Sequence, residues 1–106
     1  MYVSLTAIRV PLGQMSTLRR LIESEYLAVA RQHPGYVRSY LLEQIDDETH
    51  AQLVQVWQQQ ADLEAFRKTG AAEQANRSLH QQISQLHMQS QGYIVRLMPE
   101  DAETHH

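Results

Sequence analysis

Glu25 is a carboxylate at a position where the spacing of its neighbours predicts an apolar side chain. Four apolar residues around it recur at helical intervals: Leu18, Leu21, Ile22 and Val29. On a regular helix Glu25 points within about 20° of the centre of that stripe. A carboxylate in apolar surroundings is costly unless it is paired, and such surroundings also suit a proton-abstracting group. Glu25 is therefore our candidate general base, and the alternatives are an ion pair with Arg9 or Arg38 and a side chain that reaches solvent.

Trp57 ends a strand-like run that starts at Leu53, and a short amphipathic segment containing Phe66 follows it. An indole at the end of a strand can stack on an aromatic ligand, and a nearby phenyl ring can extend the same wall. Large aromatic side chains at such places also simply fill the core. Trp57 and Phe66 are thus candidate pocket-lining residues, with plain core packing as the alternative.

Asn76 and His80 lie in a last helical segment, beside its expected buried stripe. That stripe consists of Ala72, Ala75, Leu79, Ile83 and Leu86. Asn76 points about 50° and His80 about 90° away from it, so each is a candidate for the rim of a pocket or for the surface. His80 and His87 would be roughly 10 Å apart along a helix, too far to chelate one metal ion as a pair. No metal-ligand motif, serine elbow or phosphate loop occurs, so we expect no metal.

The composition narrows the class of protein. A chain of 106 residues without cysteine can form one domain that needs no disulfide or metal for its stability. Nine basic and twelve acidic residues leave a net charge of -3, and the scattered arginines predict no nucleic-acid-binding face. No stretch approaches the ~18 apolar residues of a membrane span, and no leader-like segment is recognisable. We therefore expect a cytoplasmic protein without a nucleic-acid or membrane partner.

Hydrophobic spacing divides the chain into alternating strands and helices. Period-two alternation predicts strands over residues 2–10, 36–44, 51–57 and 93–97. Helical spacing predicts helices over about 15–32, 61–68 and 71–88. This order is the split βαβ pattern of an α+β, ferredoxin-like domain, with a four-stranded antiparallel sheet and helices on one face. The domain is expected to span residues 1–98, and residues 99–106 to form a tail.

One face of such a sheet is left without a cover. Four positions are expected to place apolar side chains on it: Ile8, Val54, Val56 and at least one of Tyr36 and Tyr40. A soluble sheet must cover an apolar second face or risk aggregation. A homodimer that packs sheet against sheet is the simplest solution, and the last strand and the tail could also reach the partner.

Three short features of the chain are distinctive together. They are Gly13 after the first strand, Pro34-Gly35-Tyr36, and Val56-Trp57 followed by Ala61-Asp62-Leu63-Glu64-Ala65-Phe66. With these features, residues 2–97 resemble the antibiotic biosynthesis monooxygenase superfamily of dimeric α+β barrels. The resemblance implies the fold and the dimer. Its members include cofactor-independent oxygenases of polycyclic phenols and quinols, haem-degrading oxygenases and proteins without known activity.

Two subgroups of that superfamily have marker residues that can be compared with this chain. The haem-degrading members carry an Asn on the first strand and a Trp and a His on the later helices, where this chain has Thr6, Phe66 and Asn76. We therefore expect no haem degradation. The aromatic-polyketide oxygenases carry an Asn, a Tyr and an Arg around the strand Trp, where this chain has Leu53, Leu63 and Arg77. Only Trp57 and Arg77 match.

Arg77 matches the second subgroup in residue type but is not expected to point into a shared site. On a regular helix it points about 150° from the buried stripe, toward solvent or a partner subunit. The same chemistry by the same residues is thus not expected.

Two functions remain open at this point. The first is a cofactor-independent monooxygenase acting on an aromatic or quinol-type small molecule, in which an electron-rich phenolate or enolate reacts with dioxygen in an apolar pocket. The second is a non-catalytic dimeric module of the same fold that binds a small molecule or is associated with stress. A cavity of a few hundred Å³ beside Glu25 and Trp57 would favour the first.

Overall fold

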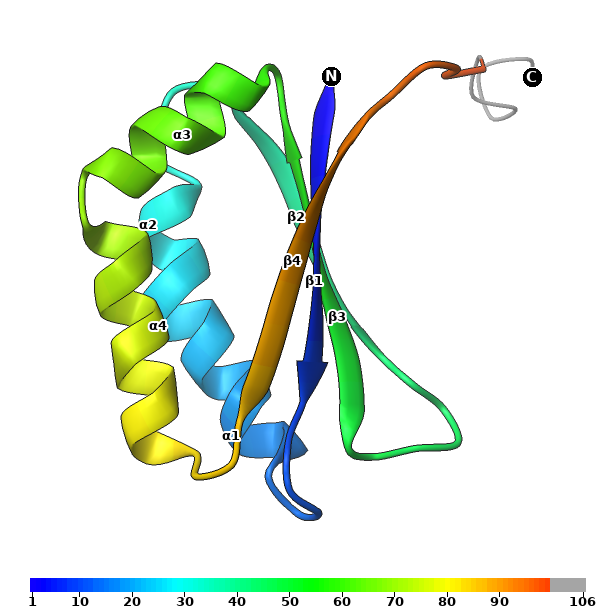
Figure 1. Cartoon of the computed structure of the whole chain (residues 1–106), viewed down its shortest axis with the longest axis vertical. Helices are drawn as coiled ribbons and strands as arrows, with labels where there is room; N and C mark the ends of the chain where they lie inside the picture. The colour runs from blue at the N-terminus through cyan, green and yellow to red at the C-terminus, as the bar shows by residue number, and fades with distance from the viewer. Residues whose placement is uncertain (100–106) are drawn as a thin grey trace.

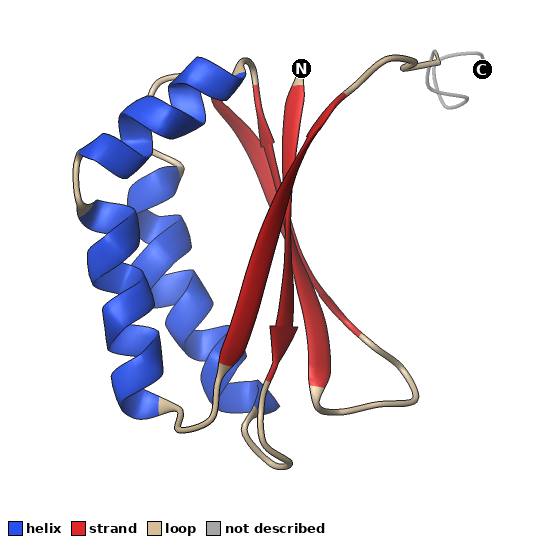
Figure 2. Ribbon diagram, in the orientation of Figure 1, coloured by secondary structure: helices blue, strands red, loops and turns tan. Residues whose placement is uncertain are grey.

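The computed structural model describes residues 1–99 and consists of an antiparallel sheet with all of its helices on one face (Figures 1 and 2). The strands are β1 (Tyr2–Arg9), β2 (Tyr36–Glu43), β3 (His50–Trp57) and β4 (His87–Ile94). The helical segments are α1 (Met15–Leu21), η1 (Ile22–Leu27), α2 (Ala28–Ala30), α3 (Gln60–Lys68) and α4 (Ala71–Gln82). The strand order β2-β3-β1-β4 confirms the predicted ferredoxin-like α+β fold.

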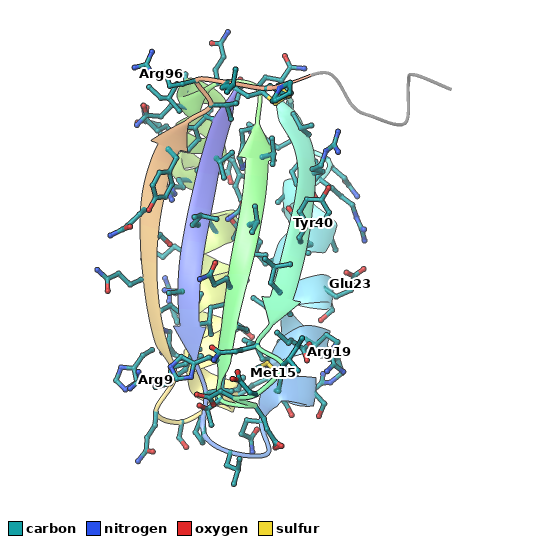
Figure 3. The ribbon with its side chains drawn as sticks, turned by 90° about the vertical axis from the view of Figure 1, so that its right-hand side faces the viewer. Arg9, Met15, Arg19, Glu23, Tyr40 and Arg96 are labelled. Carbon is teal, nitrogen blue, oxygen red and sulfur yellow. The ribbon has the colours of Figure 1, made fainter. Side chains whose placement is uncertain are left out.

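Strand register assigns each side chain to one of the two faces of the sheet. Along β1, Ser4, Thr6 and Ile8 are buried under the helices, whereas Val3, Leu5 and Ala7 face the other side. We call that other side the open face; Figure 3 looks onto it and shows Tyr40 of β2 there. Tyr40 pairs with Val54, and Val56 lies on the same side.

Ile8, which was expected on the open face, lies on the helix side instead, and so does one of the two tyrosines considered for that face, Tyr36. Ile8 is only 2% exposed and belongs to the main hydrophobic core. Tyr36 pairs with Trp57 and packs edge-on against it, with ring centroids 5.5 Å apart. Ile8 follows the alternation of β1, and a bulge between Tyr36 and Arg38 shifts the alternation of β2. The expectation for Ile8 was wrong, and of the two tyrosines only Tyr40 lies on the open face.

The first long helix contains a π-helical turn, η1, that sequence spacing did not predict. A π turn accommodates one more residue than an α turn, so later inward positions move one residue along the chain. Tyr26 is therefore turned inward in place of Glu25, which is exposed, and Ala30 is fully buried in place of Val29. The expectation that Glu25 points at the sheet was wrong for this reason.

The last helix and strand were also placed incorrectly from the sequence. The structure ends α4 at Gln82 and starts β4 at His87, so the predicted helix to residue 88 and strand from residue 93 were wrong. Ile83 and Leu86 lie in the connecting turn, where Gln85 has a φ of 59°, and both are buried. They continue the spacing of the buried helix residues past the end of the helix, which made the helix look longer in the sequence. β4 lacks clear apolar alternation because it is a polar strand at the sheet edge.

The buried core is divided into two clusters under the helices. The larger includes Ile8, Leu18 and Leu79, and the smaller consists of Tyr2, Ala30, Trp57, Leu63 and Phe66. Tyr26 packs against both clusters. None of the helices within residues 1–99 is long and apolar enough to cross a membrane. Of the predicted tail, residues 100–106 lie outside the described residues.

Gly35 lies in the turn between α2 and β2, close to the start of α3, and this close approach can be tested by substitution. Its φ is +89°, and an added Cβ would collide with the Asp62 side chain, which accepts the Gln59 backbone N–H at 3.1 Å at the start of α3. Gly13 has φ +87° with nothing near its Cβ position. We expect Gly13→Ala to cost about 1–2 kcal/mol of unfolding free energy, and Gly35→Ala about 1–3 kcal/mol more.

Urea unfolding followed by Trp57 fluorescence measures both variants under the same conditions. Equal costs for the two glycines would contradict the predicted contact with Asp62.

Candidate functional site

A cavity of about 440 Å³ lies between the helices and the covered face of the sheet. The sheet contributes Thr6, Leu53, Gln55, Met88 and Ser90 to its walls, and the helices contribute Ile22, Tyr26, Arg67, Ala72, Glu73, Asn76 and Leu79. A cavity of this size matches those that hold small organic ligands. The walls combine apolar side chains with the polar groups of Tyr26, Arg67, Glu73 and Asn76 around a polar floor, and this combination makes it the candidate functional site.

The polar floor of the cavity is formed by adjacent strands. Thr6 is 4% exposed, Gln55 is 3% exposed, and the Thr6 hydroxyl lies 2.7 Å from the hydroxyl of Ser90 on β4. These polar residues occupy inward strand positions, where apolar side chains would pack best. Buried polar groups need hydrogen-bond partners, and Thr6 and Gln55 have them within the protein. Because both residues also line the cavity, they provide polar groups that a ligand could contact.

Gln55 is the most constrained polar side chain of this floor. Its Oε1 accepts a hydrogen bond of 2.8 Å from the Tyr26 hydroxyl and one of 3.3 Å from the Trp57 Nε1–H. An indole N–H can only donate, so the amide oxygen must be the atom that faces it. These two bonds fix the orientation of the amide.

Tyr26 reaches the cavity from η1 and is held by its surroundings. Its ring packs edge-on against Phe66, with centroids 5.7 Å apart. Burial raises the pKa of the Tyr26 phenol above its ordinary value of 10.0, against opposing effects of the Gln55 hydrogen bond and the Arg67 charge. The phenol therefore stays protonated at neutral pH, and it acts as a donor to Gln55 rather than as a base.

Trp57 and Phe66 support the site from behind and do not line the cavity. Trp57 is fully buried and Phe66 is 1% exposed, and their rings stack with centroids 5.7 Å apart. The expectation that they form pocket walls is corrected, because this stacking places both in the smaller core cluster. Trp57 contacts the site through its hydrogen bond to Gln55.

The other predicted site residues are not brought together. Asn76 lies among the cavity-lining residues on α4. His80 is exposed on the same helix and is absent from the cavity walls, and Glu25 is exposed on η1. Arg77 is exposed, as expected, and donates to Glu73 at 3.2 Å. The cavity thus does not contain the expected base. Neither Glu25 nor Trp57 lines it, so it is not the cavity beside both residues that was expected to favour the oxygenase.

Sequence reasoning missed Tyr26, Gln55, Ser90 and Glu73. Gln55 had a usable signal, because it is a polar residue at an inward position of a strand whose neighbours Leu53 and Trp57 are buried. Tyr26 had none, because only the π turn of η1 directs it inward. Ser90 was missed because it fell between the predicted helix to residue 88 and the predicted strand from residue 93, whereas the structure places it in β4.

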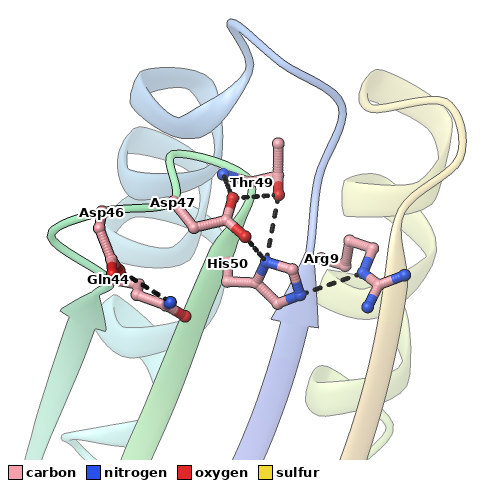
Figure 4. Close-up of polar contacts among 6 residues, drawn as sticks. All are labelled: Arg9, Gln44, Asp46, Asp47, Thr49 and His50. Carbon is pink, nitrogen blue, oxygen red and sulfur yellow. Dashed lines mark hydrogen bonds and ion pairs between the residues drawn. The ribbon is translucent and has the colours of Figure 1, made fainter.

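A second, larger cavity of about 560 Å³ lies at the end of the sheet that carries the hairpin between β2 and β3. His50 in its wall is engaged with neighbouring groups (Figure 4): its Nδ1 is 2.7 Å from Asp47, and its Nε2 accepts a hydrogen bond of 3.2 Å from Arg9 Nε. Glu43, also in the wall, is paired with Arg19. Hydrogen bonds from Thr49 lower the pKa of the Asp47 carboxyl. These groups are exposed and mutually paired, so the smaller, polar-floored cavity is the better candidate site. Within residues 1–99, no cluster of His, Asp and Glu could hold a metal ion.

The sequence profile described as antibiotic biosynthesis monooxygenase matches residues 1–78. The chain belongs to this family. The match agrees with the fold and with the resemblance carried by Gly13, Pro34-Gly35-Tyr36 and Val56-Trp57. No curated protein matches the chain at a significant level.

Solved structures share the fold at low sequence identity. An antibiotic biosynthesis monooxygenase-type protein from Nitrosomonas europaea is 16% identical with a TM-score of 0.76, over 92% of this chain and 100% of that chain. SnoaB, a cofactor-independent oxygenase from Streptomyces nogalater, is 16% identical with a TM-score of 0.78, over 93% and 98%. MhuD with two manganese protoporphyrin IX molecules per active site is 20% identical with a TM-score of 0.64, over 95% and 100%. At these identities the likeness shows the fold alone.

The protonation of Tyr26 can be tested by an alkaline titration of the tyrosines. The chain has five tyrosines, and Tyr26→Phe should remove a component that ionises above pH 10. Since the folded pKa is raised, the stability due to the neutral phenol is complete below pH 10 and is lost as the pH rises through the folded value. Absorbance of tyrosinate measures this, and an unchanged high-pH component in Tyr26→Phe would contradict the assignment.

Proposed function

We propose that this member of the family is a cofactor-independent monooxygenase that binds an aromatic, quinol-type small molecule in the cavity between η1, α4 and the sheet. The observation that supports it is a cavity of about 440 Å³ in which the polar floor of Thr6, Gln55 and Ser90 lies beside apolar side chains such as Ile22, Leu53 and Leu79. An apolar planar ligand with one polar edge complements such a site. The shared fold with the oxygenase SnoaB agrees with the proposal.

The reaction needs no cofactor when the substrate itself supplies the electrons. An anthrone-type CH₂ group next to a phenolic ring can lose a proton and give an electron-rich anion. Dioxygen then takes up four electrons in total: one oxygen atom becomes the new carbonyl, and the other leaves as water with the two hydrogens. The cavity would hold the anion near Arg67 and limit the access of water. Arg67 is the only lysine or arginine among the described residues that line the cavity.

Glu73 is the candidate acceptor for the substrate proton in this proposal. It is the only carboxylate among the described residues that line the cavity, and it is exposed at the cavity mouth on α4. Arg77, one turn later on α4, donates a hydrogen bond of 3.2 Å to this carboxylate. An exposed carboxylate can pass the proton on to solvent, which regenerates the base after each turnover.

The departures from the haem-degrading subgroup remain part of the proposal. Thr6 and Asn76 line the cavity, and Phe66 is buried behind it in contact with Trp57. Thr6 is hydrogen-bonded to Ser90, and no histidine is among the described cavity-lining residues to bind a haem iron. A phenol or quinol therefore fits this site better than haem does.

Oxygen uptake tests the proposed activity. Anthrone, 1-naphthol and hydroquinone should be screened with the protein in the presence of a chelator, and at least one should show protein-dependent uptake with ¹⁸O from labelled dioxygen in its product. Glu73→Gln should lower kcat by about 10²-fold, because it removes the proton acceptor. Glu25→Gln serves as the matched control and should leave turnover unchanged, since Glu25 is exposed away from the cavity.

Binding of these probes without any oxygen uptake would instead support the non-catalytic small-molecule-binding module. A metal-dependent turnover, lost with the chelator, would contradict the cofactor-independent reaction.

We also propose that the protein is a homodimer that packs open face against open face. Apolar side chains run across the four strands on this face: Val3, Leu5, Tyr40, Leu42, Val54, Val56 and Tyr93. Tyr40 is 48% and Leu42 52% exposed, and Leu97 and Met98 are exposed on the segment that leaves the sheet after β4 (Figure 1). Contiguous apolar surface of this kind marks an interaction site.

Light scattering after size exclusion should give about twice the chain mass of 12.3 kDa at micromolar concentration. Leu42→Lys should shift the protein toward the monomer, because it places a charge within the proposed interface. Ile45→Lys makes the same change at a fully exposed loop position and should leave the dimer intact. A monomeric parent protein, or equal behaviour of the two variants, would contradict the sheet-to-sheet dimer.

A further inference from the structure

We propose that Gln55 is the specificity-determining residue of the cavity, and that its side-chain NH₂ group selects ligands with a carbonyl or oxyanion oxygen. The inference rests on the proposed binding function and names the chemistry that the ligand must carry. It is built on the hydrogen bonds around Gln55, on its burial and on the donors that face the cavity with it.

The orientation of the Gln55 amide leaves its nitrogen free. Oε1 accepts from both Tyr26 and Trp57, and Nε2 makes no hydrogen bond within residues 1–99. Among those residues no polar side-chain atom is both sealed from solvent and without a partner. Gln55 is only 3% exposed and lines the cavity, so its NH₂ group is reached through the cavity.

The other polar groups of the lining do not occupy the Gln55 nitrogen, although the Thr6 and Ser90 hydroxyls and the Asn76 amide can both donate and accept. Arg67 can only donate, and the Tyr26 hydroxyl already donates to Gln55. The one carboxylate in the described lining, Glu73, is exposed at the mouth and bound to Arg77. Since no described residue accepts a hydrogen bond from the Gln55 nitrogen, a ligand that displaces water from it must offer an acceptor oxygen or leave its N–H groups unpaired.

Tyr26 is a positioning residue in this arrangement. Its hydroxyl and the Trp57 indole hold the amide oxygen from two directions, so the NH₂ group has one orientation before the ligand arrives. A preorganised donor binds an acceptor without a further loss of side-chain entropy. Removal of the hydroxyl alone should loosen the amide and leave the apolar walls unchanged.

The test compares two rigid probes of nearly the same shape, 9-fluorenone and fluorene, which differ in one carbonyl oxygen. Equilibrium dialysis gives the two dissociation constants for each protein variant. The parent protein should bind fluorenone at least about tenfold more tightly than fluorene, because only the ketone satisfies the amide. Gln55→Glu keeps an acceptor for Tyr26 and Trp57 but removes the donor, so it should abolish this preference while fluorene affinity changes less than about threefold.

The matched control is Gln74→Glu, which makes the same change at an exposed position of α4 outside the cavity walls and should keep the preference. Tyr26→Phe gives a second, independent variant: it should reduce the ketone preference with little effect on fluorene, whereas a merely structural role would weaken both probes equally. In NMR spectra, the Gln55 side-chain amide signals, identified by their absence in Gln55→Glu, should shift with fluorenone and not with fluorene.

Two results would overturn the inference. Equal affinity of the parent protein for the two probes, or an unchanged preference in folded Gln55→Glu, contradicts the role of Gln55 and leaves aromatic binding in place. A folded parent protein that binds neither probe contradicts the aromatic ligand of the proposed function, and the role of Gln55 fails with it.

Discussion

The amide oxygen of Gln55 joins the parts of this fold that surround the cavity. It accepts hydrogen bonds from Tyr26 on η1 and from Trp57 at the end of its own strand, β3. Tyr26 packs against both core clusters, and Trp57 stacks on Phe66 of α3. A buried amide that lost either donor would be left partly unsatisfied in a low-dielectric interior. The helix–sheet geometry around the cavity thus depends on this polar interaction together with the core residues Ile22, Leu53 and Leu79, which also line the cavity.

The π turn of η1 makes that interaction available. A regular α-helix through this segment would direct Glu25 toward the sheet and Tyr26 away from Gln55, and so bury a charge beside an amide that needs a donor. The extra residue accommodated by the π turn instead exposes the carboxylate and delivers a neutral phenol. Such irregular turns weaken the helix locally, and their occurrence at a cavity wall is consistent with a site that is maintained for binding.

The sequence predicted the fold because the strands near the sheet centre alternate regularly, and because the helical spacing located the first two predicted helices although it missed the π turn of η1. The prediction of element boundaries was wrong where the spacing of buried residues does not match the secondary structure. Leu86 keeps helical spacing from a turn, and β4 is a polar edge strand, so both ends of that connection were misplaced. For the site, Trp57 was recognised but its role as a hydrogen-bond donor was not. Tyr26 could not be found, because single-residue shifts in helical phase leave no mark in hydrophobic spacing.

Alternate residues of the same strands face opposite sides of the sheet. The proposed ligand cavity and the proposed dimer interface are therefore built from neighbouring residues. On β3, Leu53, Gln55 and Trp57 face the cavity side, while Val54 and Val56 face the open side. β1 alternates in the same way, with Thr6 inward and Leu5 outward. A partner on the open face would thus restrain, from behind, the central strands that carry the polar floor. A hydrogen-bond donor binds well only when it is held in place. A partner that covers the open face would hold β3 in place, and β3 carries the Gln55 amide on its other side.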